Sequence, residues 1–158
     1  MSNALTGLAG EYYVLAQLAH RNLVATMTLS NTKGVDILVT NQELNKLFKV
    51  EVKTTKSKPG KSSLFGDGKY YKWVMNKNNE DARQSNLFYC FVALQGYEEL
   101  PRIFVVPSNY VGDYLKSQHK IWLNAPRDNP VRDTSMRNFR IDEQDPEGFQ
   151  NNWEVFLS

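Results

Sequence analysis

The sequence predicts one domain of the α/β (α+β) class, spanning residues 1–158, in which a β-sheet is covered by helices. Three observations predict this fold. Apolar residues recur at helical spacing from residue 3 to about residue 20 or 22. Strand-like segments follow up to residue 54. Residues 87–94 then form a near-continuous apolar run, which is typical of a central strand buried on both faces.

The first helix is expected to bury one apolar stripe against the sheet. Glu11 lies on the flank of this stripe, four residues before Leu15, so its carboxylate is expected to be partly buried. The expected stripe consists of Leu5, Leu8, Ala9, Tyr12, Leu15, Ala16 and Ala19.

Three strands are expected after this helix, paired as an antiparallel meander. They span residues 23–29, 35–40 and 47–54. Side chains alternate between the two faces of a strand, so Glu51 and Lys53 share one face of the sheet. Val50 and Val52 point to the other face, into the core. Asp36 opens the second strand, and pairing with the third strand would bring it beside Glu51.

The second half of the chain is expected to add a helix, two further strands, a C-terminal helix and a docked tail. Residues 57–69 have the composition of a loop, and the polar residues 76–83 favour a helix. Residues 70–75 form either a short strand or the start of that helix. The remaining strands and helix are expected at 87–94, 102–106 and 108–119. Apolar residues dispersed over 139–157 either dock on the core or form the surface of a homodimer.

Positive charge is concentrated in the centre of the chain. The net charge is only +2, but nine lysines and two acids lie between residues 46 and 77. Such a basic segment is typical either of a solvated loop or of a surface that binds a polyanion. Within it, Tyr70, Tyr71 and Trp73 are more typical of a core than of a platform for unpaired bases.

A cytoplasmic location is expected from three features of the sequence. Cys90 is the single cysteine, so the chain cannot form an internal disulfide. No apolar stretch is long enough to cross a bilayer, and the N-terminus lacks the pattern of a signal peptide.

The acids and the lysine of the meander have the chemistry of a divalent-cation site. Mg²⁺ prefers oxygen ligands and is usually bound by one or two carboxylates with several waters. Asp36 and Glu51 would supply two carboxylates, and the backbone carbonyl of Val52 would supply a third oxygen. Lys53 would stabilise negative charge that develops on a phosphate. Glu11 would bind a metal-coordinated water or a second ion.

The chain resembles the PD-(D/E)xK nuclease superfamily at Glu11, at the segment GVDILV (34–39) and at the segment VEVKTT (50–55). Its layout is most similar to archaeal Holliday-junction resolvases and related restriction-endonuclease-like proteins. The resemblance implies a restriction-endonuclease-like core and cleavage of phosphodiester bonds with Mg²⁺ or Mn²⁺. It rests on motifs in the first third of the chain and on the order of elements in the remainder.

The resemblance implies a role for each matching residue. Asp36 would be the first metal-binding acid, Glu51 the second, and Lys53 the catalytic lysine. Glu11 would be the supporting acid of the first helix. Val35 stands where the name-giving proline of the superfamily would stand, a position that does not touch the chemistry. Nucleic acid would be held by Lys33, Lys56, Lys58, Lys61 and Lys72.

The leading hypothesis is therefore a metal-dependent nuclease acting on DNA. A second hypothesis is a catalytically silent nuclease-like module that binds nucleic acid or a protein partner, for which Asp36 and Glu51 would be dispensable. A third is a nuclease toxin or defence component acting on RNA. An acid followed by Glu-x-Lys also occurs by chance on solvated strands, where such neighbours contribute only about 0.2–1 kcal/mol.

Overall fold

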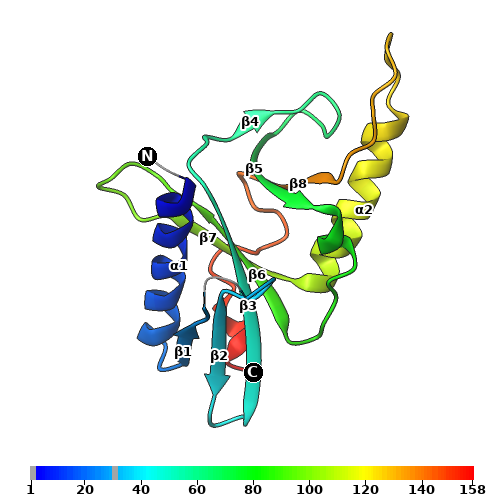
Figure 1. The fold of residues 1–158 in the computed structure, drawn as a ribbon. Coiled ribbons are helices and arrows are strands. Elements are labelled where there is room, and N and C mark those ends of the chain that lie inside the picture. The colour runs from blue at the N-terminus through cyan, green and yellow to red at the C-terminus, as the bar shows by residue number, and fades with distance from the viewer. Residues whose placement is uncertain (1–2, 30–31) are drawn as a thin grey trace.

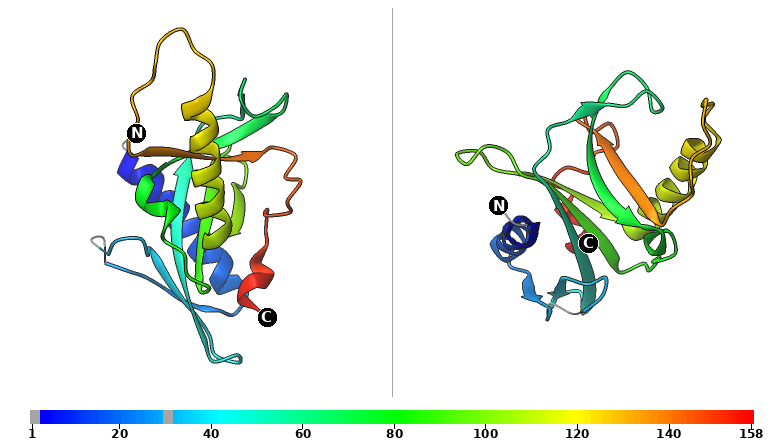
Figure 2. Two further views of the ribbon diagram at one scale, coloured as in Figure 1. Left: turned by 90° about the vertical axis from the view of Figure 1, so that its right-hand side faces the viewer. Right: turned by 45° about the horizontal axis from the view of Figure 1, so that its top comes forward.

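The computed structural model describes residues 3–29 and 32–158, which are arranged in layers (Figure 1). A five-stranded sheet lies in the middle of the molecule. Helix α1 (Asn3–His20) covers one face of it, and a three-stranded sheet with helix α2 (Ser108–Asn124) covers the other (Figure 2). The fold is thus mixed α+β, as the sequence predicts.

The five-stranded sheet has the order β1-β2-β3-β6-β7. Its strands are β1 (Val24–Met27), β2 (Ile37–Asn41), β3 (Lys46–Thr55), β6 (Leu87–Ala93) and β7 (Arg102–Pro107). The first three form the expected antiparallel meander, and β6 lies parallel to β3. Every residue of β6 is buried: Phe88, Cys90 and Val92 pack in the α1 layer, and Tyr89 and Phe91 pack in the other. This confirms a central strand with two apolar faces.

The sequence did not lead us to expect the second sheet. It has the order β4-β5-β8, with strands β4 (Gly60–Lys61), β5 (Lys69–Asn76) and β8 (Met136–Asp142). Tyr71, Trp73 and Met75 of β5 point into the core against β6 and α2, so the aromatic residues of this segment are core residues. The helix expected at 76–83 is corrected to a single 3-10 turn, η1 (Lys77–Glu80), because its asparagines favour caps over helix interiors.

The apolar residues of the C-terminal tail seal the core of the chain itself. Phe139 and Ile141 of β8 pack between the two sheets. Trp153 and Phe156, in the 3-10 turn η2 (Trp153–Phe156), pack on the other side of the central sheet. The tail therefore docks, and these side chains do not form the surface of a homodimer. Within residues 3–29 and 32–158, no helix has the length and apolar character needed to cross a membrane.

The face of α1 that meets the sheet differs from the expected stripe. Leu5 and Tyr12 are more than half exposed. The cause is a close approach at Gly10, where a Cβ would lie 1.9 Å from Oγ1 of Thr54 on β3. Because Gly10 has no side chain, the side chain of Thr54 packs directly against the helix at this point. The buried residues of the helix are Thr6, Gly10, Val14 and Leu18.

Gly10→Ala is expected to destabilise the protein, although alanine is the better helix former. The added methyl would overlap Thr54 and push α1 off the sheet, and overpacking of this kind costs about 1–3 kcal/mol. Gly7→Ala is the matched control, because no atom lies within 4 Å of its added Cβ. It is expected to stabilise the helix by about 0.5–1 kcal/mol. Urea unfolding of both variants checks this, and equal stabilisation by both would contradict the close approach.

Candidate active site

Asp36 lies where β2 stops pairing with β3. Its backbone N–H donates to the carbonyl of Val50 (2.8 Å), and its Oδ2 accepts from the N–H of Val52 (2.6 Å). The Asp36 carboxylate thus accepts the backbone N–H of Val52, at the point on the edge of β3 where β2 no longer pairs with it. In a strand the N–H and C=O of one residue point to the same side, so the Val52 carbonyl also faces the Asp36 edge.

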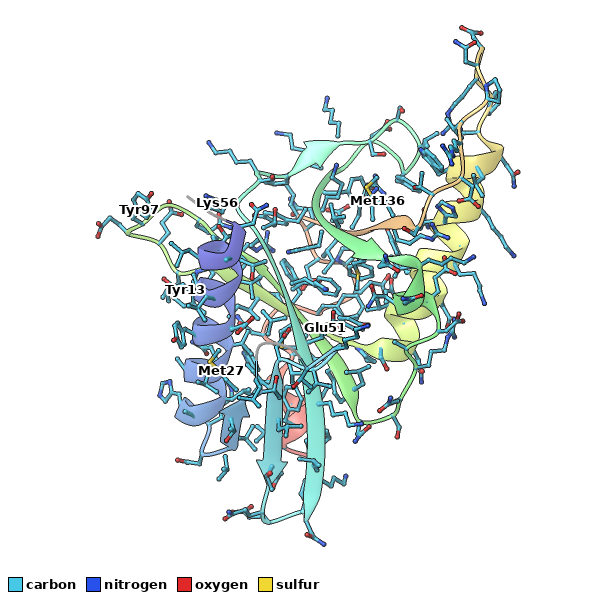
Figure 3. The ribbon with its side chains drawn as sticks, in the orientation of Figure 1. Tyr13, Met27, Glu51, Lys56, Tyr97 and Met136 are labelled. Atoms are coloured by element: carbon cyan, nitrogen blue, oxygen red, sulfur yellow. The ribbon has the colours of Figure 1, made fainter. Side chains whose placement is uncertain are left out.

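Glu51 and Lys53 lie on the face of β3 that is turned away from α1. Figure 3 shows Glu51 near the middle of the molecule, beside β3. Its side chain is only 10% exposed, and Nζ of Lys53 lies 2.7 Å from its Oε1. Continuing the register of Ile37 opposite Val50 places Asp36 opposite Glu51. The structure therefore brings the two acids and the lysine together at the position that the strand alternation predicts.

Negative charge is only partly compensated at this position. Burial raises the pKa of Asp36, the N–H of Val52 lowers it, and the charge of Glu51 raises it again. Lys53 acts in the opposite direction to Glu51 but does not reverse the net upward shift in the pKa of Asp36. A carboxylate whose charge is disfavoured in this way gains stability from a proton or from a bound cation.

Glu11 projects from α1 towards the same edge of the sheet. Burial raises the pKa of Glu11, and the negative charge of Asp36 raises it further, so the two carboxylates are near enough to repel. Among residues 3–29 and 32–158, however, no three acidic, histidine or cysteine side chains form a group able to hold a metal ion. The role expected for Glu11, as a ligand of a metal-coordinated water or of a second ion, stays a prediction.

The donor atoms fit a hard divalent cation. Asp36, Glu51 and the Val52 carbonyl would present oxygen atoms, with no sulfur or nitrogen ligand among them. Two carboxylates leave several coordination positions for water and phosphate oxygens, which is how Mg²⁺ is usually bound in proteins. The uncompensated charge between Asp36 and Glu51 also favours a cation at this point.

An open cleft of about 500 Å³ lies over Glu51 and Lys53. Most of its lining residues carry polar side chains, and they come mainly from the turn before β2, from β3 and from the segment around η1. The lining residues that the sequence does not predict include Lys49, Asn76, Asn78, Asn79 and Gln84. The asparagine run was visible in the sequence, but only the second sheet places it opposite β3.

The five lysines expected to bind nucleic acid are dispersed over the molecule. Lys33 lines the cleft beside Glu51. Lys56 lines a different hollow with Tyr13 and Tyr97, on the α1 side of the molecule (Figure 3). Lys72 lies on the outward face of β5, directly opposite Arg140 of β8. The two others, Lys58 and Lys61, are exposed between β3 and β5.

A solved structure to which the fold of this chain is similar is that of a bacterial homing endonuclease, I-Ssp6803I. The two structures align with a TM-score of 0.54 over 99% of this chain and 91% of the endonuclease chain, at 14% sequence identity. The chain shares its fold with an endonuclease. No protein family model matches the sequence, and no curated protein matches it. The nuclease-like fold therefore rests on the likeness in three-dimensional structure alone.

Proposed function

We propose that this chain is a metal-dependent nuclease of the PD-(D/E)xK superfamily that hydrolyses phosphodiester bonds in DNA. The observation that carries the proposal is the convergence of Asp36, Glu51 and Lys53 at one point of β3, beneath an open cleft, on a fold shared with an endonuclease. The choice of DNA follows from the resemblance to junction resolvases.

In this proposal each side chain has one task. Asp36 and Glu51, with the Val52 carbonyl, hold the cation. A bound Mg²⁺ or Mn²⁺ would make a coordinated water more acidic and neutralise charge on the phosphate. The ammonium of Lys53, held at 2.7 Å by Glu51, lies where it can orient the attacking water and stabilise the charge that develops on the phosphate. Glu11 orients a water that belongs to the cation.

The walls of the cleft suit the rest of the substrate. Lys33 and Lys49 add positive charge to the cleft that contains Glu51 and Lys53, and the carboxamides of Asn78 and Asn79 in η1 provide neutral hydrogen-bond partners. Contacts from lysines to phosphates would make binding weaken as salt concentration rises. Lys49 is already oriented, because its Nζ donates to Oε1 of Gln84 (3.0 Å).

Cleavage of a panel of nucleic acids tests the proposal. Purified protein is incubated with single-stranded, duplex and branched DNA and with RNA, with Mg²⁺, with Mn²⁺ and with a chelator. We expect at least one DNA to be cut with metal and none with the chelator. Lys53→Ala is expected to slow cleavage at least about 10²-fold, because a preorganised charge is lost from the reaction centre.

Two outcomes of this experiment would reject parts of the proposal. Cleavage of RNA alone would reject the assignment to DNA. If no substrate is cut under any condition, the enzymatic function fails, and salt-dependent binding that survives Asp36→Asn would then identify a silent binding module.

A further inference from the structure

Tyr89 lies next to Glu51 in the central sheet and belongs to none of the predicted motifs. The parallel pairing of β3 with β6 places the two residues side by side, on the face that carries the cleft. Tyr89 is fully buried, and its ring stacks on Phe91 with centroids 5.7 Å apart. A tyrosine in such a core must find partners for its hydroxyl group, because an unpaired buried hydroxyl is costly.

The hydroxyl of Tyr89 has partners on two sides. Nδ2 of Asn79 donates a hydrogen bond to it over 3.1 Å. On the other side lies the carboxylate of Glu51, which the strand register places beside Tyr89 and whose charge acts on its hydroxyl. A tyrosine hydroxyl is protonated at neutral pH, so it can donate a hydrogen bond to a carboxylate.

Asn79 is itself fixed by the local structure of η1. Its Oδ1 accepts from the backbone N–H of Asn76 (2.9 Å), and the Asn76 side chain in turn accepts from the backbone of the turn, so the two form a capping box. The next residue, Glu80, is buried in an ion pair with Arg137 of β8 (2.6 Å). The capping box fixes the start of η1 and the ion pair fixes its end, so Asn79 between them has a fixed position.

We propose that Tyr89 is a positioning residue for Glu51, and that Asn79 fixes the direction in which Tyr89 donates. This inference rests on the proposed function. Nζ of Lys53 contacts Oε1 of Glu51, and the Lys53 side chain is itself 30% exposed. A hydrogen bond donated by the buried Tyr89 hydroxyl supplies, in this proposal, a second point of attachment. Together the two contacts fix the plane of the carboxylate that would bind the cation.

Tyr89→Phe removes the hydroxyl and leaves the ring and its packing in place. Residues that orient a metal ligand typically contribute 10–100-fold to metal affinity, so we expect the Kd for Mn²⁺, measured by calorimetry, to rise by about that factor. Tyr114→Phe is the matched control, because it removes a partly buried hydroxyl that bonds to Arg140, away from the Asp36 edge of the sheet. It is expected to leave the Kd unchanged.

Substitution of Asn79 tests whether this residue affects Mn²⁺ binding by orienting the hydroxyl of Tyr89. Asn79→Ala is expected to weaken Mn²⁺ binding by a smaller factor than Tyr89→Phe. The double variant is expected to bind as weakly as Tyr89→Phe alone, because Asn79 then has no hydroxyl to orient. If the double variant instead weakens Mn²⁺ binding by the product of the two single effects, Asn79 does not act through Tyr89.

The outcomes separate this inference from the proposed function. If the wild type binds Mn²⁺ and Tyr89→Phe binds it equally well, the positioning role is wrong and the nuclease proposal stands. If the wild type binds no Mn²⁺, the nuclease proposal fails, and crystal structures of wild type and Tyr89→Phe decide the positioning role. A reoriented Glu51 carboxylate in the variant supports the role, and an unchanged carboxylate overturns it.

Discussion

Asp36→Asn is expected to abolish metal-dependent cleavage and, at the same time, to make the metal-free protein more stable. The loss of activity follows because one of the two carboxylates that would hold the cation is removed, and a fall of at least about 10²-fold is expected. The asparagine oxygen can still accept the N–H of Val52, so the local backbone is expected to keep its structure.

The gain in stability follows from the pKa of Asp36. Burial and the charge of Glu51 raise this pKa in the folded protein, so the ionised carboxylate opposes folding at neutral pH. Asparagine carries no charge, and a gain of about 0.5–2 kcal/mol, typical of one stabilising substitution, is expected at pH 7. The gain should shrink as the pH falls through the raised pKa, because wild-type Asp36 is then protonated as well.

Thermal unfolding with a chelator, at pH 7 and at lower pH, measures this effect. Asp67→Asn serves as the control, because Asp67 is an exposed residue between β4 and β5 that lies outside the cleft. We expect it to change neither stability nor cleavage. An Asp36→Asn protein that is less stable than wild type at pH 7 would contradict the assigned electrostatics, and one that still cleaves would contradict the assigned site.

Glu80→Ala is expected to cause the largest loss of stability of the substitutions considered. The ion pair of Glu80 with Arg137 is almost fully excluded from water, with side chains 8% and 4% exposed. Removing one partner leaves the other charge buried without compensation, which typically costs 3–5 kcal/mol. The guanidinium then keeps its contacts to the carbonyls of Thr134 and Met136, which carry no compensating charge. Urea unfolding measures the loss.

Two comparisons isolate the cause of this loss. Asp113→Ala breaks the exposed pair with Arg83, in which Asp113 is 72% exposed, and should cost no more than about 1 kcal/mol. Replacing both buried partners, by Glu80→Leu with Arg137→Met, should recover most of the loss, because no charge is then left buried. A double variant as unstable as Glu80→Ala would show that shape, rather than charge, holds η1 in place.

The candidate site was the part of the molecule most open to prediction from sequence. The alternation in β3 sets the faces of Glu51 and Lys53, and the meander brings Asp36 to them, so local pattern and near-neighbour pairing suffice. The packing face of α1 was predicted wrongly, because apolar periodicity selects large residues. The contact is set instead by the absence of a side chain at Gly10.

The second sheet and the residues around Glu51 could not be predicted from local sequence patterns, because they depend on contacts between distant segments of the chain. β5 pairs with β8, whose residues lie 60 or more positions further along the chain, and this pairing brings η1 to the cleft. Tyr89 lies in an apolar run that reads only as a buried strand. A role for its hydroxyl becomes visible only in the structure, where the parallel register places Tyr89 beside Glu51 and Asn79 of η1 donates a hydrogen bond to it.

Calorimetric titration of Mn²⁺ into wild type and Asp36→Asn, side by side at one pH, tests the central claim most directly. The claim is that Asp36 and Glu51 hold a divalent cation beside Lys53. We expect the wild type to bind Mn²⁺, and to release more protons on binding as the pH is lowered towards the raised pKa of Asp36. Asp36→Asn is expected to lose this binding, and Asp67→Asn to keep it. A wild type that binds no Mn²⁺, or an Asp36→Asn protein that binds it unchanged, would contradict the claim.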